Sequence, residues 1–181
     1  MTTSDLERPA APARPAHWAE PLPAHGVPNL HRLTPTLLRS AQPRSASIAA
    51  IHALGVRTIV SFRAYNPDKY RLRGVECRLV RVPIDTWHIR DRHVVQALAA
   101  ILAAEREGPV LIHCMHGADR TGVISAMYRM VVQGWDKAAA RQEMFDGGFG
   151  YHTLWRNIPA FLDRVDPRAI EAGVREAMQA G

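Results

Sequence analysis

The sequence predicts an α/β fold in which helices flank a central, mainly parallel sheet. Three short apolar or β-branched runs have the composition of buried strands, and segments of helical length separate and follow them. This alternation is typical of the α/β class. Of the 181 residues, 47% are hydrophobic and 22% are charged, which excludes a disordered chain. A chain of this length is expected to form a single globular domain.

The first 28 residues are predicted to form an extended N-terminal arm, and 29–181 the globular domain. The arm contains six of the thirteen prolines, and proline disfavours both helices and sheet ladders. Trp18 is the one aromatic side chain in this stretch, and we expect it to anchor the arm on the domain. The arm lacks the apolar segment of a secretory signal, and no apolar run is long enough to span a membrane. We therefore expect a cytoplasmic protein without stable membrane insertion.

From residue 29 onward, strands and helices are predicted in alternation. Residues 29–33 and 36–40 are expected to pair as a hairpin. Further strands are expected where the chain is apolar or β-branched, at 57–62, 77–84 and 110–114. Helices are expected where apolar periodicity meets boundary signals, at 45–54, from a cap at Asp91 to Gly108, and at 121–133, 136–145, 152–162 and 166–178. In the polar, arginine-rich stretch 63–74, Asn66-Pro67-Asp68 is predicted to mark a turn.

The basic residues are concentrated in one region of the chain. The formal net charge is +6, and residues 57–92 alone contain nine basic and four acidic residues. A local basic patch favours an anionic ligand over a nucleic-acid coat, which would extend further along the chain. We therefore expect an anionic substrate and no nucleic-acid partner.

The segment 113–122, HCMHGADRTG, lies between a predicted buried strand and a predicted buried helix, where α/β proteins place their sites. Successive backbone N–H groups at the start of a helix form an anion site, and they favour the thiolate form of a cysteine such as Cys114. Arg120 can bind two oxygens of a tetrahedral oxyanion. Gly117 and Gly122 permit the turn. The pattern predicts a thiolate nucleophile beside a phosphate-sized anion site.

This segment resembles the HCxxGxxRTG signature of the cysteine-dependent protein tyrosine and dual-specificity phosphatases, and it matches every fixed position. Asn29-Leu30 and residues 38–43 (LRSAQP), followed by 54–60 (LGVRTIV), are similar to segments of an atypical dual-specificity branch found in bacteria, fungi and plants. The resemblance covers about 29–162. It implies the phosphatase fold, a phosphocysteine intermediate and hydrolysis of phosphotyrosine, phosphoserine or phosphothreonine in proteins.

By this resemblance, Cys114 is the nucleophile, Arg120 holds the phosphate, and Thr121 assists breakdown of the intermediate. His113 would orient the loop from behind. The backbone amides of six consecutive residues would form the phosphate cradle: Met115, His116, Gly117, Ala118, Asp119 and Arg120.

The reaction also needs a carboxyl group that protonates the leaving oxygen. In the family this group usually follows the strand about thirty residues before the signature, and Asp85, 29 residues before Cys114, occupies that place. In some lipid-directed relatives the acid is the aspartate directly before the signature arginine, which is Asp119 here. Asp91 is more typical of a helix cap. Both Asp85 and Asp119 are candidates for the general acid.

Other functions stay open at this point. The basic region is also compatible with phosphoinositide or inositol phosphate substrates, and a catalytically silent phosphate-binding module is a further alternative. Cys77 is predicted to lie too far from Cys114 for a disulfide, because it begins a strand whereas Cys114 ends a parallel one. We expect a monomer without a cofactor. We also expect no metal, since four histidines show no ligand-like spacing: His17, His25, His31 and His52.

Overall fold

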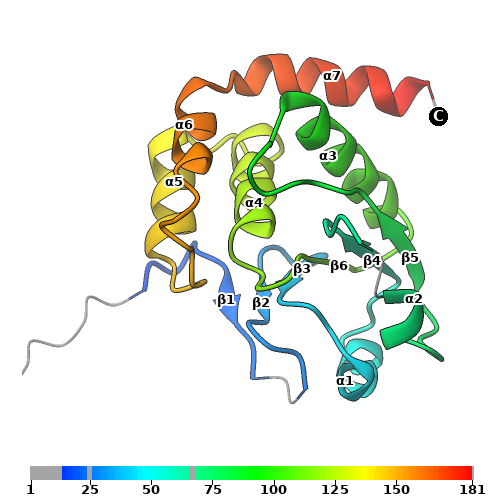
Figure 1. Ribbon diagram of the computed structural model, residues 1–181. Helices are drawn as coiled ribbons and strands as arrows, with labels where there is room; N and C mark the ends of the chain where they lie inside the picture. The colour runs from blue at the N-terminus through cyan, green and yellow to red at the C-terminus, as the bar shows by residue number, and fades with distance from the viewer. Residues whose placement is uncertain (1–13, 24–25, 66–67, 181) are drawn as a thin grey trace, which may run out of the picture.

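The computed structural model describes residues 14–23, 26–65 and 68–180. Within them, six strands form one sheet in the order β1-β2-β3-β6-β4-β5 (Figure 1). β2 pairs antiparallel with β1 and β3, whereas β6 is parallel to β3 and β4, and β4 is parallel to β5. The strands are β1 Glu20–Pro21, β2 His31–Arg32, β3 Leu37–Ser40, β4 Thr58–Ser61, β5 Arg78–Arg81 and β6 Val110–His113. The predicted mainly parallel sheet and the predicted hairpin are thereby confirmed.

Helices cover both faces of this sheet. In Figure 1, α3 to α7 lie on one side of the strands, and α1 and α2 lie on the other. The helices are α1 Ile48–Ala53, preceded by a 3₁₀ turn at Ser45–Ser47, then α2 Asp68–Arg71, α3 Asp91–Glu105, α4 Arg120–Val131, α5 Lys137–Asp146, α6 Asn157–Arg164 and α7 Pro167–Gln179. Among the described residues, no helix combines the length and the apolarity that crossing a bilayer requires.

Successive side chains of the central strands pack alternately into two hydrophobic cores. Ile59 and Leu111 join the core beneath α1 and α2, whereas Val60 and Ile112 join the larger core beneath α3 to α7. This alternation follows from the two-residue period of a strand. β6 is buried on both faces, and its first three residues, 110–112, are accordingly a continuous apolar run. The strand that leads into the signature segment is therefore fully buried, as are its two neighbours β3 and β4.

The structure corrects the sequence predictions at α2 and at the start of α3. The stretch 63–74, for which no helix was predicted, contains the short helix α2, whose first residue, Asp68, is buried. Asn66 and Pro67 of the predicted turn lie outside the described residues. The polar composition of this stretch does not predict a buried helix. Asp68 can be buried because its carboxylate has hydrogen-bond partners. Asp91 is the first residue of α3 and not its cap, since Arg90 occupies the N-cap position.

The start of α6 is also later than predicted. The helix begins at Asn157 and not near residue 152, because the chain before it is held in a turn by other contacts. The backbone N–H of His152 donates to Asp119 Oδ1 at 3.0 Å, and the Tyr151 hydroxyl donates to the Trp155 carbonyl at 2.7 Å. These contacts bring the segment between α5 and α6 against the signature loop.

The described part of the N-terminal segment packs against the domain. β1 pairs with β2, so the segment enters a sheet ladder despite its prolines. The Ala19 N–H donates to Glu143 Oε1 at 2.6 Å. Trp18 is half-buried and, with residues at the end of α5, lines a cavity of about 400 Å³, which agrees with the predicted anchoring role. Residues 1–13 of the predicted arm lie outside the described residues.

Candidate active site

The signature segment connects the end of β6 to the start of α4. Cys114 follows the last residue of β6 and is 1% exposed, and α4 begins at Arg120. The N-terminal end of α4 therefore closes the loop that Cys114 opens. A helix N-terminus and the loop amides before it favour an anion at this place. The structure thus positions the predicted phosphate cradle between a buried strand and a buried helix.

The shape of the loop depends on Gly117 and on its contacts with β3. Gly117 has a φ of +71°, and a Cβ atom there would lie 2.5 Å from the carbonyl of Ser40. Beside it, the buried Arg39 donates from Nη2 to the Gly117 carbonyl at 2.7 Å. The Arg39 guanidinium also lies 3.6 Å from the centroid of the Phe149 ring, and burial lowers its pKa to about 10. Only glycine fits this position, and Arg39 fixes it from beneath.

A buried hydrogen-bonded chain supports the loop from the other side. His113 Nε2 lies 2.9 Å from Asp68 Oδ2, and Nδ1 lies 3.0 Å from the Cys114 carbonyl. Gln42 donates to Asp68 Oδ1 at 2.6 Å and accepts from Arg63 at 2.9 Å. Burial acts to raise the pKa of Asp68, but the hydrogen bonds from His113 and Gln42 outweigh it and lower that pKa. The predicted position of His113 behind the loop agrees with these contacts.

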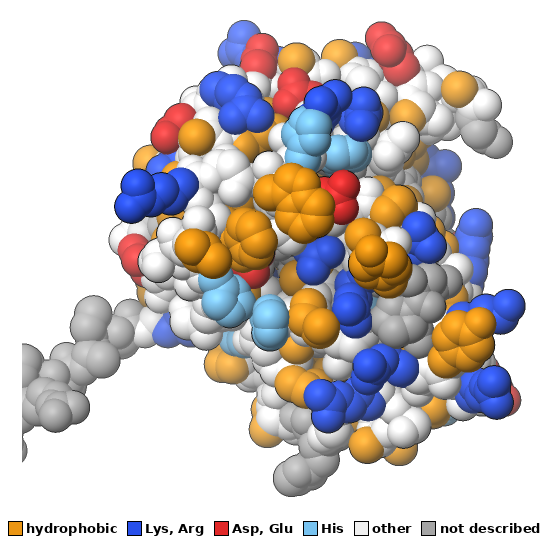
Figure 2. All heavy atoms as spheres, viewed as in Figure 1, with side chains coloured by type: hydrophobic (Ala, Val, Ile, Leu, Met, Phe, Trp, Pro, Cys, Tyr) orange, Lys and Arg blue, Asp and Glu red, His pale blue; other side chains and the backbone are white. Residues whose placement is uncertain are grey.

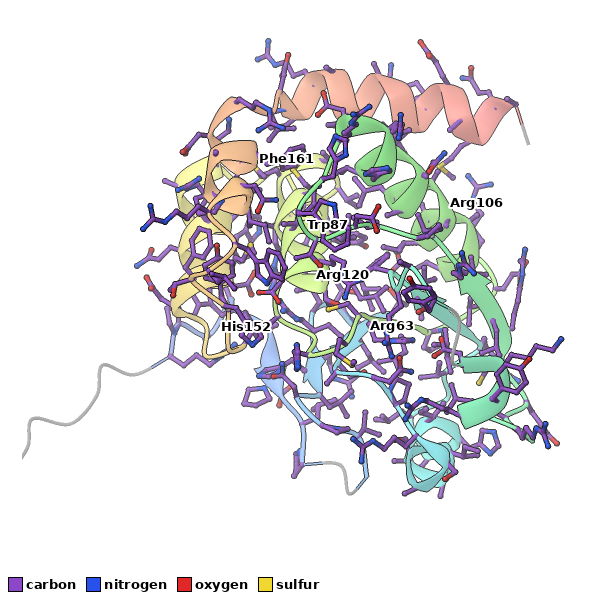
Figure 3. The ribbon with its side chains drawn as sticks, viewed as in Figure 1. Arg63, Trp87, Arg106, Arg120, His152 and Phe161 are labelled. Atoms are coloured by element: carbon purple, nitrogen blue, oxygen red, sulfur yellow. The ribbon has the colours of Figure 1, made fainter. Side chains whose placement is uncertain are left out.

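Arg120 faces a cavity of about 340 Å³ at the carboxyl edge of the sheet. Its Nη1 donates to the carbonyls of Phe62 and Ile84 at 3.3 and 3.2 Å, so the segments that follow two parallel strands orient the guanidinium. Figure 3 shows Arg120 between Trp87, His152 and Arg63. The cavity is lined by Arg63, Thr86, Met115, His116, Asp119, Arg120, His152, Leu154 and Trp155.

The two candidate acids have different surroundings. Asp119 is 5% exposed and lines the cavity, but both of its carboxyl oxygens are engaged by His152: one by the backbone N–H at 3.0 Å, the other by Nδ1 at 2.8 Å. Asp85 is exposed, and its side chain makes no hydrogen bond within the described residues. It directly follows Ile84, whose carbonyl accepts a hydrogen bond from Arg120, and it precedes Thr86, which lines the cavity, whereas Asp85 itself does not line it.

Two polar atoms of the signature segment are buried without a partner among the described residues. They are Arg120 Nε and Thr121 Oγ1. Leaving a buried donor unpaired costs about 1–3 kcal/mol. These atoms are therefore suited to a ligand that accepts hydrogen bonds. Cys77, in contrast, donates from Sγ to the Val56 carbonyl at 3.1 Å, and neither cysteine is in a disulfide.

Sequence reasoning missed several residues that shape the site. Asp68 and His152 contact the signature segment from 45 and 33 residues away, and nothing in their local sequence indicates this. Asn29 and Gln42 belong to the upstream segments that carried the family resemblance. Asn29 donates to the carbonyls of His116 and Phe149 at 2.9 and 3.0 Å. For these two residues, the family resemblance of the upstream segments could have indicated a place in the site.

Known proteins are similar to this chain in sequence and in structure. A family model described as "DSP-PTPase phosphatase fused to NAD+ Kinase" matches residues 29–151. The dual specificity protein phosphatase TpbA of Pseudomonas aeruginosa (strain UCBPP-PA14) is 44% identical over 172 residues, which cover 95% of this chain and 75% of that protein.

The solved structures agree with the sequence comparison. A P. aeruginosa TpbA variant in complex with pTyr superposes with a TM-score of 0.82 at 40% identity, covering 93% of this chain and 100% of that chain. The catalytic core of the PP-IP phosphatase SIW14 from S. cerevisiae, in complex with citrate, shares the fold with a TM-score of 0.67 at 22% identity, over 83% of this chain and 94% of that chain. This chain belongs to the DSP-PTPase family and is an enzyme of the protein tyrosine and dual-specificity phosphatase class.

Proposed function

We propose that this enzyme hydrolyses phosphotyrosine, phosphoserine and phosphothreonine in proteins through a phosphocysteine intermediate on Cys114. The observation that carries the proposal is the set of unpaired donors around this buried cysteine. Arg120 Nε and Thr121 Oγ1 lack partners among the described residues, and the cradle amides lie at the N-terminus of α4. A tetrahedral phosphoryl group supplies the acceptor oxygens that these donors lack.

In the proposed first step, the Cys114 thiolate attacks phosphorus, a sulfur–phosphorus bond forms and the ester oxygen–phosphorus bond breaks. Arg120 and the cradle amides stabilise the charge on the equatorial oxygens. Asp85 gives its proton to the leaving oxygen. In the second step, a water molecule attacks phosphorus and loses a proton to Asp85. Inorganic phosphate leaves, and Cys114 returns to the thiolate with help from the Thr121 hydroxyl.

We assign the acid to Asp85 because Asp119 is held by His152. Asp85→Asn is expected to lower kcat about 10²-fold on phosphotyrosine, whose leaving group needs a proton, and only a few-fold on nitrophenyl phosphate. Steady-state kinetics on both substrates check this, with Asp91→Asn as a matched exposed control. If Asp119→Asn shows the leaving-group dependence and Asp85→Asn does not, the acid is Asp119.

The rim of the pocket supports an aromatic phosphoester as substrate. Near the centre of this face, hydrophobic side chains lie around a few basic side chains, and histidines lie beside them (Figure 2). Trp87 and Leu154 are 67% and 81% exposed, and Trp155 lines the cavity with Leu154. Exposed apolar groups of this size around a cavity with charged lining residues are typical of a binding site. The relative TpbA has been solved with pTyr, which supports the same class of ligand here.

A second pocket favours an alternative substrate class, the phosphoinositides and inositol phosphates. This cavity of about 330 Å³ adjoins the first, sharing Arg63, Met115 and His116, and Arg44 and Arg71 also line it. Burial and the neighbouring guanidiniums of Arg120 and Arg71 lower the pKa of Arg63. Cations gathered in this way are suited to a second phosphate group on the same substrate.

Arg71→Ala tests this alternative. If the second pocket binds a phosphate, the ratio of kcat/KM between an inositol polyphosphate and nitrophenyl phosphate is expected to fall about tenfold, the scale of a charged hydrogen bond. Arg73→Ala, an exposed arginine outside the pocket, is the matched control. An unchanged ratio in Arg71→Ala would remove the pocket from substrate binding.

The proposed function as a whole is tested by a substrate panel. Phosphopeptides, phosphoinositides and inositol phosphates are compared by phosphate release, with Cys114→Ser as the blank. The proposal expects the highest kcat/KM on phosphopeptides. A higher value on an inositol phosphate would establish the alternative instead.

A further inference from the structure

Three side chains of types that can ligate a metal lie together in the lining of the catalytic cavity, and none of them takes part in the proposed chemistry. His116 comes from the signature loop, Asp119 from the N-cap of α4, and His152 from the segment between α5 and α6. Each offers one ligand atom, and these atoms lie within 4.8 Å of one another. Imidazole nitrogen and carboxylate oxygen are donors that Zn²⁺ and its neighbours in the first transition series prefer.

Two of these ligands are already held in place. The buried Asp119 carboxylate lies 2.8 Å from His152 Nδ1 and also accepts the backbone N–H of His152. A divalent metal ion can therefore take the place of the proton between the imidazole and the carboxylate. The structure needs little rearrangement for that exchange.

The third ligand is close and available. The His116 ring centroid lies 4.8 Å from that of His152, with the planes tilted by 59°. The His116 imidazole is exposed and makes no hydrogen bond within the described ranges, and the His152 side chain is 45% exposed. Rotation of His116 completes a three-ligand set that opens to solvent, which gives an ion direct access from solution.

We propose that His116, Asp119 and His152 bind a divalent transition metal ion such as Zn²⁺, and that the bound ion inhibits the phosphatase. All three residues line the cavity that Arg120 faces, so the ion lies where the substrate enters. Three protein ligands leave an open coordination position. Arg63 and Arg120 line the same cavity and repel a cation, so the site binds more weakly than a structural zinc site. Binding is independent of the proposed function, whereas inhibition rests on it.

The binding experiment uses protein without the Cys114 thiol, which could itself bind the metal ion. A cysteine thiolate also binds Zn²⁺, so calorimetric titration with Zn²⁺ is performed on Cys114→Ser protein. One ion per chain is expected. Adding His152→Ala or His116→Ala is expected to weaken binding at least about tenfold, and Asp119→Asn, a conservative change, to weaken it similarly. His52→Ala, an exposed histidine on α1, is the matched control and is expected to bind as the parent does.

Absence of Zn²⁺ binding to Cys114→Ser, or equal binding by the His152→Ala and His52→Ala derivatives, would overturn the site. Thermal melting of each variant verifies that it is folded.

Inhibition is measured separately on protein with Cys114 intact. The Zn²⁺ concentration that halves nitrophenyl phosphate hydrolysis is expected to rise at least about tenfold in His152→Ala and to stay unchanged in His52→Ala. Metal binding without inhibition would overturn the inhibitory role alone. Since the titration uses a chain without its nucleophile, its outcome does not depend on the proposed reaction.

Discussion

Cys114→Ser is expected to lower kcat on phosphotyrosine by about 10⁵-fold or more, the scale seen when a covalent nucleophile is removed. The serine hydroxyl is not ionised under conditions in which a thiolate is, whereas the cradle and Arg120 stay in place. The variant should therefore still bind phosphotyrosine. Phosphate release measures the fall in kcat, and calorimetric titration with phosphotyrosine measures the retained binding.

Cys77→Ser is the matched control. Cys77 is half-buried, its thiol donates to the Val56 carbonyl, and burial raises its pKa, so it is not suited to nucleophilic attack. Its replacement is expected to change kcat less than about twofold. Turnover that survives in Cys114→Ser and disappears in Cys77→Ser would contradict the assignment of the nucleophile.

The largest expected effect on stability comes from Arg129 in α4. This buried arginine forms two hydrogen bonds of 2.7 Å with the buried carboxylate of Glu143 in α5. Arg129→Met leaves that carboxylate buried without its charged partner, at a cost of about 3–5 kcal/mol. For a chain of this size, the melting temperature should fall by roughly 10 °C. Urea unfolding and thermal melting measure the change.

A double variant distinguishes a lost ion pair from lost packing. Arg129→Met with Glu143→Leu removes both charges and is expected to recover part of the lost stability, although the Ala19 N–H then loses its acceptor. Arg175→Met breaks the exposed pair with Glu171 and should cost less than about 1 kcal/mol. A loss below about 1 kcal/mol in Arg129→Met would contradict the buried-pair account.

The sequence predicts the sheet well because its central strands are buried on both faces. A continuous apolar run such as 110–112 is typical of a strand covered by helices on both sides, and the helix that follows it is apolar nearly all round. The helix α2 was missed because burial of Asp68 depends on His113 and Gln42, both distant in sequence. A local pattern cannot show a carboxylate whose partners come from other parts of the chain.

In the candidate site too, some residues could be predicted from the sequence and others could not. The signature places Cys114 and Arg120 on one loop, so their proximity follows from the sequence alone. The position of His152 depends on how the segment between α5 and α6 folds back on Asp119, and this follows from tertiary contacts. For the same reason, the sequence left two candidates for the acid, whereas the structure shows that one of them is hydrogen-bonded to a histidine.

The central claim is that the phosphoryl group is transferred to Cys114 before water releases it. The most direct measurement is rapid acid quenching of the enzyme during turnover of ³²P-labelled phosphotyrosine peptide, followed by mapping of the labelled fragment. The account predicts covalent label on the peptide that contains Cys114, formed within one turnover and absent in Cys114→Ser. Full turnover without covalent label on that peptide, or label on another residue, would contradict it.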